Sequence, residues 1–155
     1  MDLEFARTFY ELVVYQKART LQGQVLDVSR NFPAEERYSL TDQIRRASRS
    51  IGGQIAEGWG KRTHPKHFVS KLTDATSEAL ETQHWLITAV DSNYLSREIA
   101  TALFQHCHEI CRMLAKMMQR HENFCLPNPS TLREDPDEFF VSTHHADPFS
   151  SVPLI

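Results

Sequence analysis

At 155 residues, the sequence is long enough for one domain with a hydrophobic core and too short for two domains of ordinary size. Its 41% hydrophobic and 24% charged residues are typical of a globular protein, and no apolar run approaches the roughly 20 residues that a helix needs to cross a bilayer. The net charge of −3 is unevenly distributed: residues 1–121 contain 16 basic and 14 acidic residues, whereas residues 122–155 contain one arginine and six acids. Residues 1–7 lack the basic start and apolar stretch of an export signal, so we expect a cytoplasmic protein.

The first of four amphipathic stretches is predicted to form a helix from about Phe5 or Leu12 to Asn31. Phe32-Pro33 ends it, because proline disfavours helix in the preceding residue. Its apolar stripe, with steps of three and four residues, is Val14, Ala18, Leu21, Val25, Val28 and Phe32.

The second predicted helix begins after Ser39, a suitable N-cap, and ends at Gly58-Trp59-Gly60, where glycine can supply a left-handed stop. Its expected core stripe is Leu40, Ile44, Ala47, Ile51 and Ile55.

The third and fourth predicted helices are separated by a turn at Asp91-Ser92-Asn93. Thr63 is expected to cap the third, which tolerates Pro65 in its first turn, and Ser96 is expected to cap the fourth. Their stripes are Phe68, Leu72, Ala75, Ala79, Thr82, Leu86 and Ala89, and then Ile99, Leu103, Cys107, Ile110, Leu114 and Met117.

Four helices with short connections predict an all-α fold, an antiparallel up-down-up-down four-helix bundle with an irregular C-terminal tail. We expect residues 1–122 to form the bundle. Residues 123–155 contain five of the seven prolines and most of the acidic excess, so we expect an acidic, proline-rich tail that is extended or partly disordered. The tail also holds Phe139, Phe140, Val141, Phe149 and Leu154, so parts of it could pack on the bundle or on a neighbouring subunit.

No constellation in the sequence predicts catalysis or a cofactor. Glu81 and His84 form one Glu-x-x-His pair, which is half of a di-iron site, but the second pair that such a bundle needs is absent. Cys107 and Cys111 share a helix face and are expected to pack as small apolar side chains. We therefore expect a protein that is not an enzyme and holds no metal.

Basic and small residues on the second helix are the strongest candidates for a binding surface. The candidate phosphate contacts are Arg45, Arg46, Arg49, Lys61, Arg62 and Lys66. Two interpretations remain open: a surface for nucleic acid, or a solvated, salt-bridged face, because Asp42 and Glu57 lie nearby. Gly52 and Gly53, each unfavourable inside a helix by about 1 kcal/mol relative to alanine, suggest with Ala56 a close contact between subunits.

Several segments, in order and spacing, resemble a known family: Leu12 to Ala18, Phe32-Pro33, Tyr38 to Ala47, Ser50-Ile51, Ile55 to Gly58, and Leu80 to Gln83. Over about residues 10–120 the chain is similar to the four-helix bundle proteins encoded within intervening sequences of bacterial 23S rRNA genes. The resemblance implies a ring-like homopentamer and a relationship to the basic accessory proteins of diversity-generating retroelements, which associate with nucleic acid and a reverse transcriptase. Gly52-Gly53-Gln54 stands where the family commonly has a proline and an asparagine, and the acidic tail is not a family feature.

These observations lead to two functional hypotheses. The first is a non-enzymatic homo-oligomer, a pentamer, that acts as an accessory or scaffold for RNA, DNA or a nucleic-acid enzyme. The second is a protein–protein interaction module with no nucleic-acid role, in which the same face and the apolar tail recognise another chain.

Overall fold

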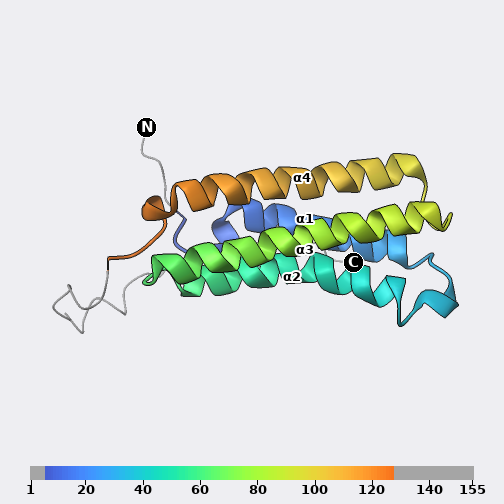
Figure 1. The fold of residues 1–155 in the computed structure, drawn as a ribbon, viewed down its shortest axis with the longest axis horizontal. Coiled ribbons are helices and arrows are strands. Elements are labelled where there is room, and N and C mark those ends of the chain that lie inside the picture. The colour runs from blue at the N-terminus through green and yellow to red at the C-terminus, as the bar shows by residue number, and fades with distance from the viewer. Residues whose placement is uncertain (1–5, 128–155) are drawn as a thin grey trace.

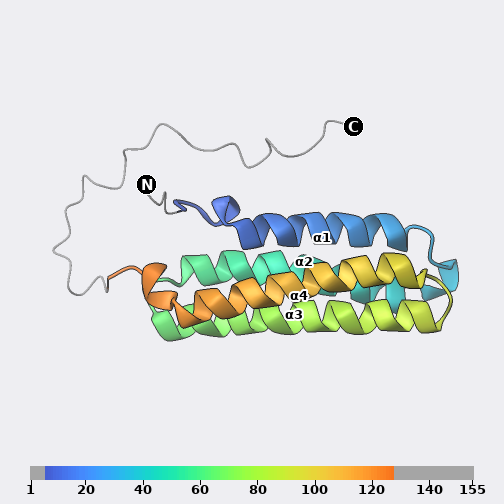
Figure 2. The same ribbon diagram turned by 90° about the horizontal axis from the view of Figure 1, so that it is seen from above.

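The computed structural model describes residues 6–127 and contains four α-helices that run alternately up and down. They are α1 (Val13–Ser29), α2 (Leu40–Gly60), α3 (Pro65–Asp91) and α4 (Arg97–Gln119). Consecutive helices pack side by side, and α4 also packs against α1, which closes the bundle (Figures 1 and 2). The predicted all-α, up-down-up-down four-helix bundle is confirmed, and residues 6–127 contain no strand.

Three short 3-10 turns, Phe9–Glu11, Ala34–Glu36 and His121–Asn123, precede α1, connect α1 to α2, and follow α4. The last turn lies at the predicted boundary between the bundle and the tail. Most of the predicted tail, residues 128–155, lies outside the described residues. None of the described helices is long and apolar enough to span a bilayer.

The apolar stripes predicted from the three-and-four spacing form the core. Every predicted stripe residue of α2 and α3 is buried, including the small residues Ala75 and Ala79 and the hydroxyl-bearing Thr82, which donates to the Glu78 carbonyl at 2.9 Å. In α1 only Val28 is less than fully buried. The prediction for Ile99 was wrong: it lies in the first turn of α4, close to the end of α3, and is exposed, while Ala100 is buried instead.

The helix α2 begins after Ser39 and ends at Gly60, as predicted, but the capping contacts at its ends and at the start of α3 differ from expectation because neighbouring groups compete for them. Ser39 stands at the N-cap of α2, but its hydroxyl donates to the Glu36 carboxylate, which in turn accepts from the Leu40 N–H at 3.4 Å. No glycine has a positive φ, so α2 does not end in a left-handed glycine; Lys61 follows with φ −104° and donates to the Gly58 carbonyl at 2.9 Å.

His64, not Thr63, is the residue that precedes α3, and Pro65 occupies its first position. The Thr63 hydroxyl lies 2.9 Å from His64 Nδ1 instead of capping the helix. The other two predictions hold: Ser96 accepts from the Ile99 N–H at 3.3 Å, and Asn93 has a φ of 59° in the turn after α3. Asparagine is among the few residues that adopt this left-handed conformation readily.

The buried α3 stripe allows a matched test of the core. Leu72 is 0% exposed, whereas Leu80, on the solvent-facing side of the same helix, is 54% exposed. We expect Leu72→Ala to lower the free energy of unfolding by about 2–5 kcal/mol, because it removes buried methyl groups and leaves a cavity. Leu80→Ala should change it by less than about 0.5 kcal/mol. Urea denaturation followed by circular dichroism measures both, and equal losses would contradict the assigned core face.

Candidate binding surfaces

The structure separates the six predicted phosphate contacts into two groups on α2 and after it. Arg45, Arg46 and Arg49 lie in the first half of α2, whereas Lys61, Arg62 and Lys66 lie at the junction between α2 and α3. Arg49 and Lys61 are twelve positions apart, which corresponds to about 18 Å along a helix axis. The six side chains therefore do not form one compact patch.

The arginines of α2 face different neighbours. Arg45 is half-buried and its Nε donates to the Ser29 hydroxyl of α1 at 2.7 Å, so part of its guanidinium is used inside the bundle. Arg46 and Arg49 are exposed. Burial raises the pKa of Glu78 on α3, with a further rise from Glu81, while the Arg46 charge acts in the opposite direction.

At the α2–α3 junction, Lys61 and Lys66 are exposed but Arg62 is engaged within the chain. Its guanidinium lies 3.6 Å from the centroid of the Trp59 ring, and its Nε donates to the Trp59 carbonyl at 2.8 Å. Burial lowers the pKa of Arg62, partly offset by Cys125. The Arg62 carbonyl also accepts from the Leu126 N–H at 3.1 Å, which holds the chain after α4 against this junction.

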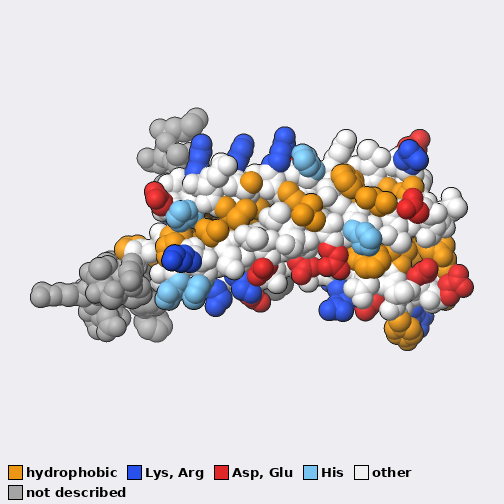
Figure 3. Space-filling view, in the orientation of Figure 1, with side chains coloured by type: hydrophobic (Ala, Val, Ile, Leu, Met, Phe, Trp, Pro, Cys, Tyr) orange, Lys and Arg blue, Asp and Glu red, His pale blue; other side chains and the backbone are white. Residues whose placement is uncertain are grey.

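A third basic group, absent from the sequence-based prediction, lies on the last turns of α4 and on its C-cap residue, Arg120. Arg112, Lys116 and Arg120 are all exposed, and we refer to them as the α4 basic row. Figure 3 shows Lys and Arg side chains projecting in a row along α4. Among residues 6–127 no carboxylate lies within ion-pair distance of these three side chains, and Glu109, on the same helix, pairs with Lys17 of α1 at 3.1 Å. The signal that could have found the row is its four-residue spacing, which places the three cations on one face.

The α4 basic row shares one end of the bundle with Lys61 and Lys66. The C-termini of α2 and α4 and the N-terminus of α3 meet at this end (Figure 1). Two carboxylates near this end form ion pairs with Lys71, Glu57 at 2.6 Å and Asp74 at 3.8 Å. A third, Glu122, is exposed. The helix dipole also favours a cation near the C-terminus of a helix. The cations at the end of α4 can therefore be explained in part by the helix itself, without a ligand.

Beside the α4 basic row lies a groove between α1 and α4, with a volume of about 420 Å³. We call it the α1/α4 groove. Val13, 55% exposed, lies in it together with Leu12, Met113 and Met117, while Lys116 and Arg120 contribute the charged part of its wall. It is therefore an apolar depression with a cationic edge.

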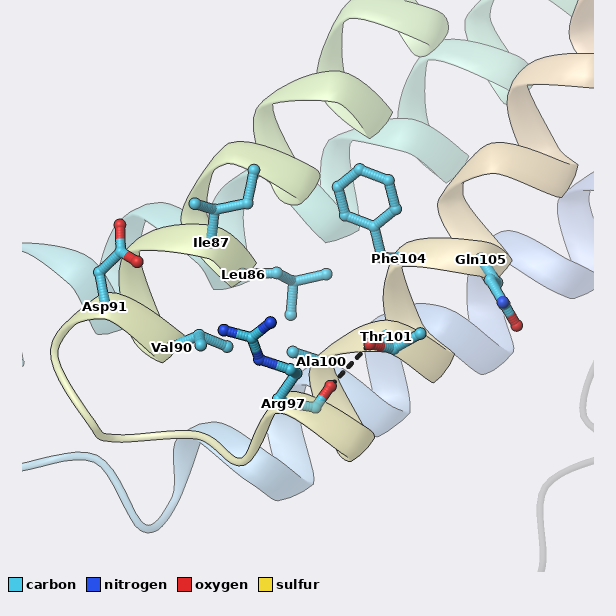
Figure 4. A pocket seen from close by; sticks show the side chains of 9 residues that line it. All are labelled: Leu86, Ile87, Val90, Asp91, Arg97, Ala100, Thr101, Phe104 and Gln105. Carbon is cyan, nitrogen blue, oxygen red and sulfur yellow. Dashed lines mark hydrogen bonds between the residues drawn. The ribbon is translucent and has the colours of Figure 1, made fainter.

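A second depression, the α3/α4 groove, lies at the opposite end, where α3 ends and α4 begins, and has a volume of about 380 Å³. Figure 4 shows Ile87 of α3 and Phe104 of α4 on its two sides, with the Arg97 guanidinium beside Leu86 and Val90. Ile87 and Phe104 are 51% and 37% exposed, so the groove presents apolar surface to solvent.

The residues proposed from sequence as an oligomer contact have different environments within one chain. Gly52 is buried, and a Cβ there would lie 3.4 Å from Tyr15 Cε2 of α1, so its close neighbour is intramolecular. Gly53 is exposed with nothing within 4 Å of an added Cβ, and Ala56 is half-buried. Because Gly53 has no side chain and Ala56 has only a methyl group, the outer face of α2 carries little side-chain bulk between Arg49 and Glu57.

The candidate metal and thiol residues are placed by the packing. Glu81 and His84 are exposed, and Glu81 accepts from Trp85 Nε1 at 3.1 Å. Within residues 6–127, no group of three His, Cys, Asp or Glu side chains could hold a metal ion. Cys107 packs in the core as predicted, and burial raises the pKa of its thiol to about 12.

The fold and these surfaces define an up-down four-helix bundle with a basic end and two apolar grooves. Residues 10–116 match the family model of the 23S rRNA-intervening sequence protein, and the chain belongs to that family. Its fold is similar to the crystal structure of a protein of unknown function from the S23 ribosomal protein family of Bacteroides thetaiotaomicron, with a TM-score of 0.63 and 26% sequence identity. The similarity covers 69% of this chain and 99% of that chain. No curated protein matches the sequence.

The glycines of α2 provide a second matched test. We expect Gly53→Ala to raise the free energy of unfolding by about 0.5–1 kcal/mol, because alanine is the better helix former and the site is open. Gly58→Ala should raise the free energy of unfolding by less, or lower it, because the added Cβ would lie 3.2 Å from Lys71 Cβ. Urea denaturation at one protein concentration compares the two. A clear loss in Gly53→Ala would contradict the open environment of this face and indicate that another chain packs against it.

Proposed function

We propose that this protein is a non-enzymatic, homo-oligomeric bundle that binds RNA or DNA as an accessory or scaffold in the cytoplasm. The observation that carries the proposal is the α4 basic row, whose three exposed cations have no carboxylate partner among the described residues. The exposed Lys61 and Lys66 extend positive charge around the same end of the bundle.

The binding mechanism would be electrostatic. Side chains four positions apart lie about 6 Å apart along a helix axis, so the α4 basic row extends over about 12 Å. Phosphates on one strand of a duplex follow at about 3.4 Å along its axis, and three cations can therefore each face a different phosphate. Such contacts position a backbone without reading its sequence. We accordingly expect binding with little sequence preference.

Self-association would multiply this surface. A single chain offers a modest number of cations, and its net charge of −3 does not favour binding to a polyanion. A homopentamer, as the family resemblance implies, would present five copies of the α4 basic row. The mass of the purified protein by light scattering should be that of five 17.9-kDa chains; a monomer would contradict the pentamer.

Substitutions on α4 test the nucleic-acid proposal. We expect Arg112→Gln/Lys116→Gln to weaken binding to labelled duplex DNA and structured RNA. If each side chain contacts one phosphate, the slope of log affinity against log salt for duplex DNA should fall in magnitude by about 1.8 per bound chain.

The matched control is Arg30→Gln/Arg37→Gln, which removes the same charge from exposed residues at the other end of the bundle. Its effect on the slope should be much smaller. Equal effects of the two double variants, or no binding by the wild-type protein at low salt, would contradict the assignment. Arg45→Ala/Arg49→Ala tests the α2 surface in the same assay.

A second candidate function is a protein–protein interaction module, favoured by the exposed Ile87 and Phe104 in the α3/α4 groove. Apolar surface of this kind is typical of contact sites. Binding of a protein in this groove should be lost in Ile87→Arg and should depend only weakly on salt. The steep salt dependence expected for phosphate contacts distinguishes the two functions.

A further inference from the structure

The α1/α4 groove has the features of a site for an apolar segment that carries acidic residues. Its apolar part includes Val13, which is 55% exposed in the described chain. Lys116 and Arg120 line the same groove, and Arg112 lies on the same face of α4. An occupant needs apolar side chains for the first part and carboxylates for the second.

Residues 134–141 of this chain, which lie outside the described residues, have that composition. Their sequence is Glu-Asp-Pro-Asp-Glu-Phe-Phe-Val, so four acids directly precede two aromatic residues and a valine. No comparable acidic and aromatic segment occurs among residues 6–127. The segment and the groove are complementary in charge and in apolar character.

The described chain ends where this segment can reach the groove. Asn123 and Phe124 line the α1/α4 groove, and Leu126 is held by its hydrogen bond to the Arg62 carbonyl at the same end of the bundle. From Pro127 to Glu134 the chain can extend about 23 Å at about 3.3 Å per residue. Neighbouring helix axes in a bundle are about 8–10 Å apart, so this length is enough to cross the end of the bundle.

We propose that residues 134–141 dock in the α1/α4 groove of the same chain. Phe139 and Phe140 cover Val13 and Met113, and the acidic side chains lie beside Lys116 and Arg120. The docked segment withdraws apolar surface from solvent and compensates the α4 basic row. Given the proposed function, on which this consequence rests, the segment competes with phosphates for the same cations.

Photo-cross-linking in the full chain tests the docking itself. With Phe140→p-benzoylphenylalanine, irradiation should give cross-links to Met113 and Met117, identified by mass spectrometry, in a product of monomer mass on a denaturing gel. The same probe at Phe149 serves as the control and should give a much lower yield at these methionines. Lys116→Glu/Arg120→Glu, at exposed positions, should reduce the yield from position 140 severalfold; circular dichroism verifies that the variant is folded.

Three outcomes would overturn the docking proposal. The first is that cross-links from position 140 are no more concentrated at the groove than those from position 149. The second is that charge reversal leaves the cross-linking yield unchanged. The third is a product of dimer mass, which would place the segment on another copy.

The competition has a separate readout. Phe139→Ala/Phe140→Ala in the full chain should bind labelled duplex DNA severalfold more tightly than the wild-type chain, because the segment no longer covers the cations. Equal affinities of the two proteins would overturn the competition. Absence of binding by both would contradict the proposed function and the competition, while the cross-linking result would still decide the docking.

Discussion

The packing of four apolar stripes against one another is the constraint on which the rest of this structure depends. Each helix has one buried stripe, and the three-and-four spacing of that stripe fixes which residues must face solvent. In α4, burying Leu103, Cys107, Ile110 and Leu114 leaves Arg112, Lys116 and Arg120 on the opposite side. The position of the α4 basic row is therefore set by the same periodicity that makes the core.

Polar contacts at each helix–helix boundary add specificity to this packing. Arg45 donates to Ser29 between α1 and α2, and Lys71 contacts Gln54 and Glu57 between α2 and α3. Gln83 donates to the Phe104 carbonyl between α3 and α4. Lys17 pairs with Glu109 between α4 and α1. The two ion pairs among these contacts, Lys17–Glu109 and Lys71–Glu57, are partly exposed to solvent, so each contributes little free energy. Their effect is to favour one arrangement of neighbours over others that would bury the same apolar area.

The helices and their core faces could be predicted from the sequence because the relevant interactions are local and repeat along the helix. The α3 stripe from Phe68 to Ala89 is buried without exception. Helix ends were less predictable, because several groups compete for the same backbone atoms. Ser39 donates to Glu36 instead of capping α2, and Ile99 follows the spacing of its stripe but lies too close to the helix start to be covered.

The candidate site was only partly predictable, for a different reason. The sequence identifies every basic residue. Whether its charge is free to bind a ligand depends on contacts with residues distant along the chain or with neighbouring side chains. Arg45 is engaged by Ser29, sixteen positions away, and Arg62 lies over the Trp59 ring. The α4 basic row could have been found from its four-residue spacing, yet its lack of carboxylate partners among the described residues becomes visible only in the folded chain.

The proposed nucleic-acid surface lies on α4, and lysine reactivity tests this placement most directly. Acetylation of exposed amines, quantified by mass spectrometry for the free protein and for its complex with structured RNA, compares Lys116 with Lys61 and Lys66, all three of which are exposed in the structure. We expect Lys116 to lose reactivity in the complex. Unchanged reactivity of Lys116 in a saturated complex, with protection confined to Lys61 and Lys66, would contradict it and place the bound strand at the α2–α3 junction.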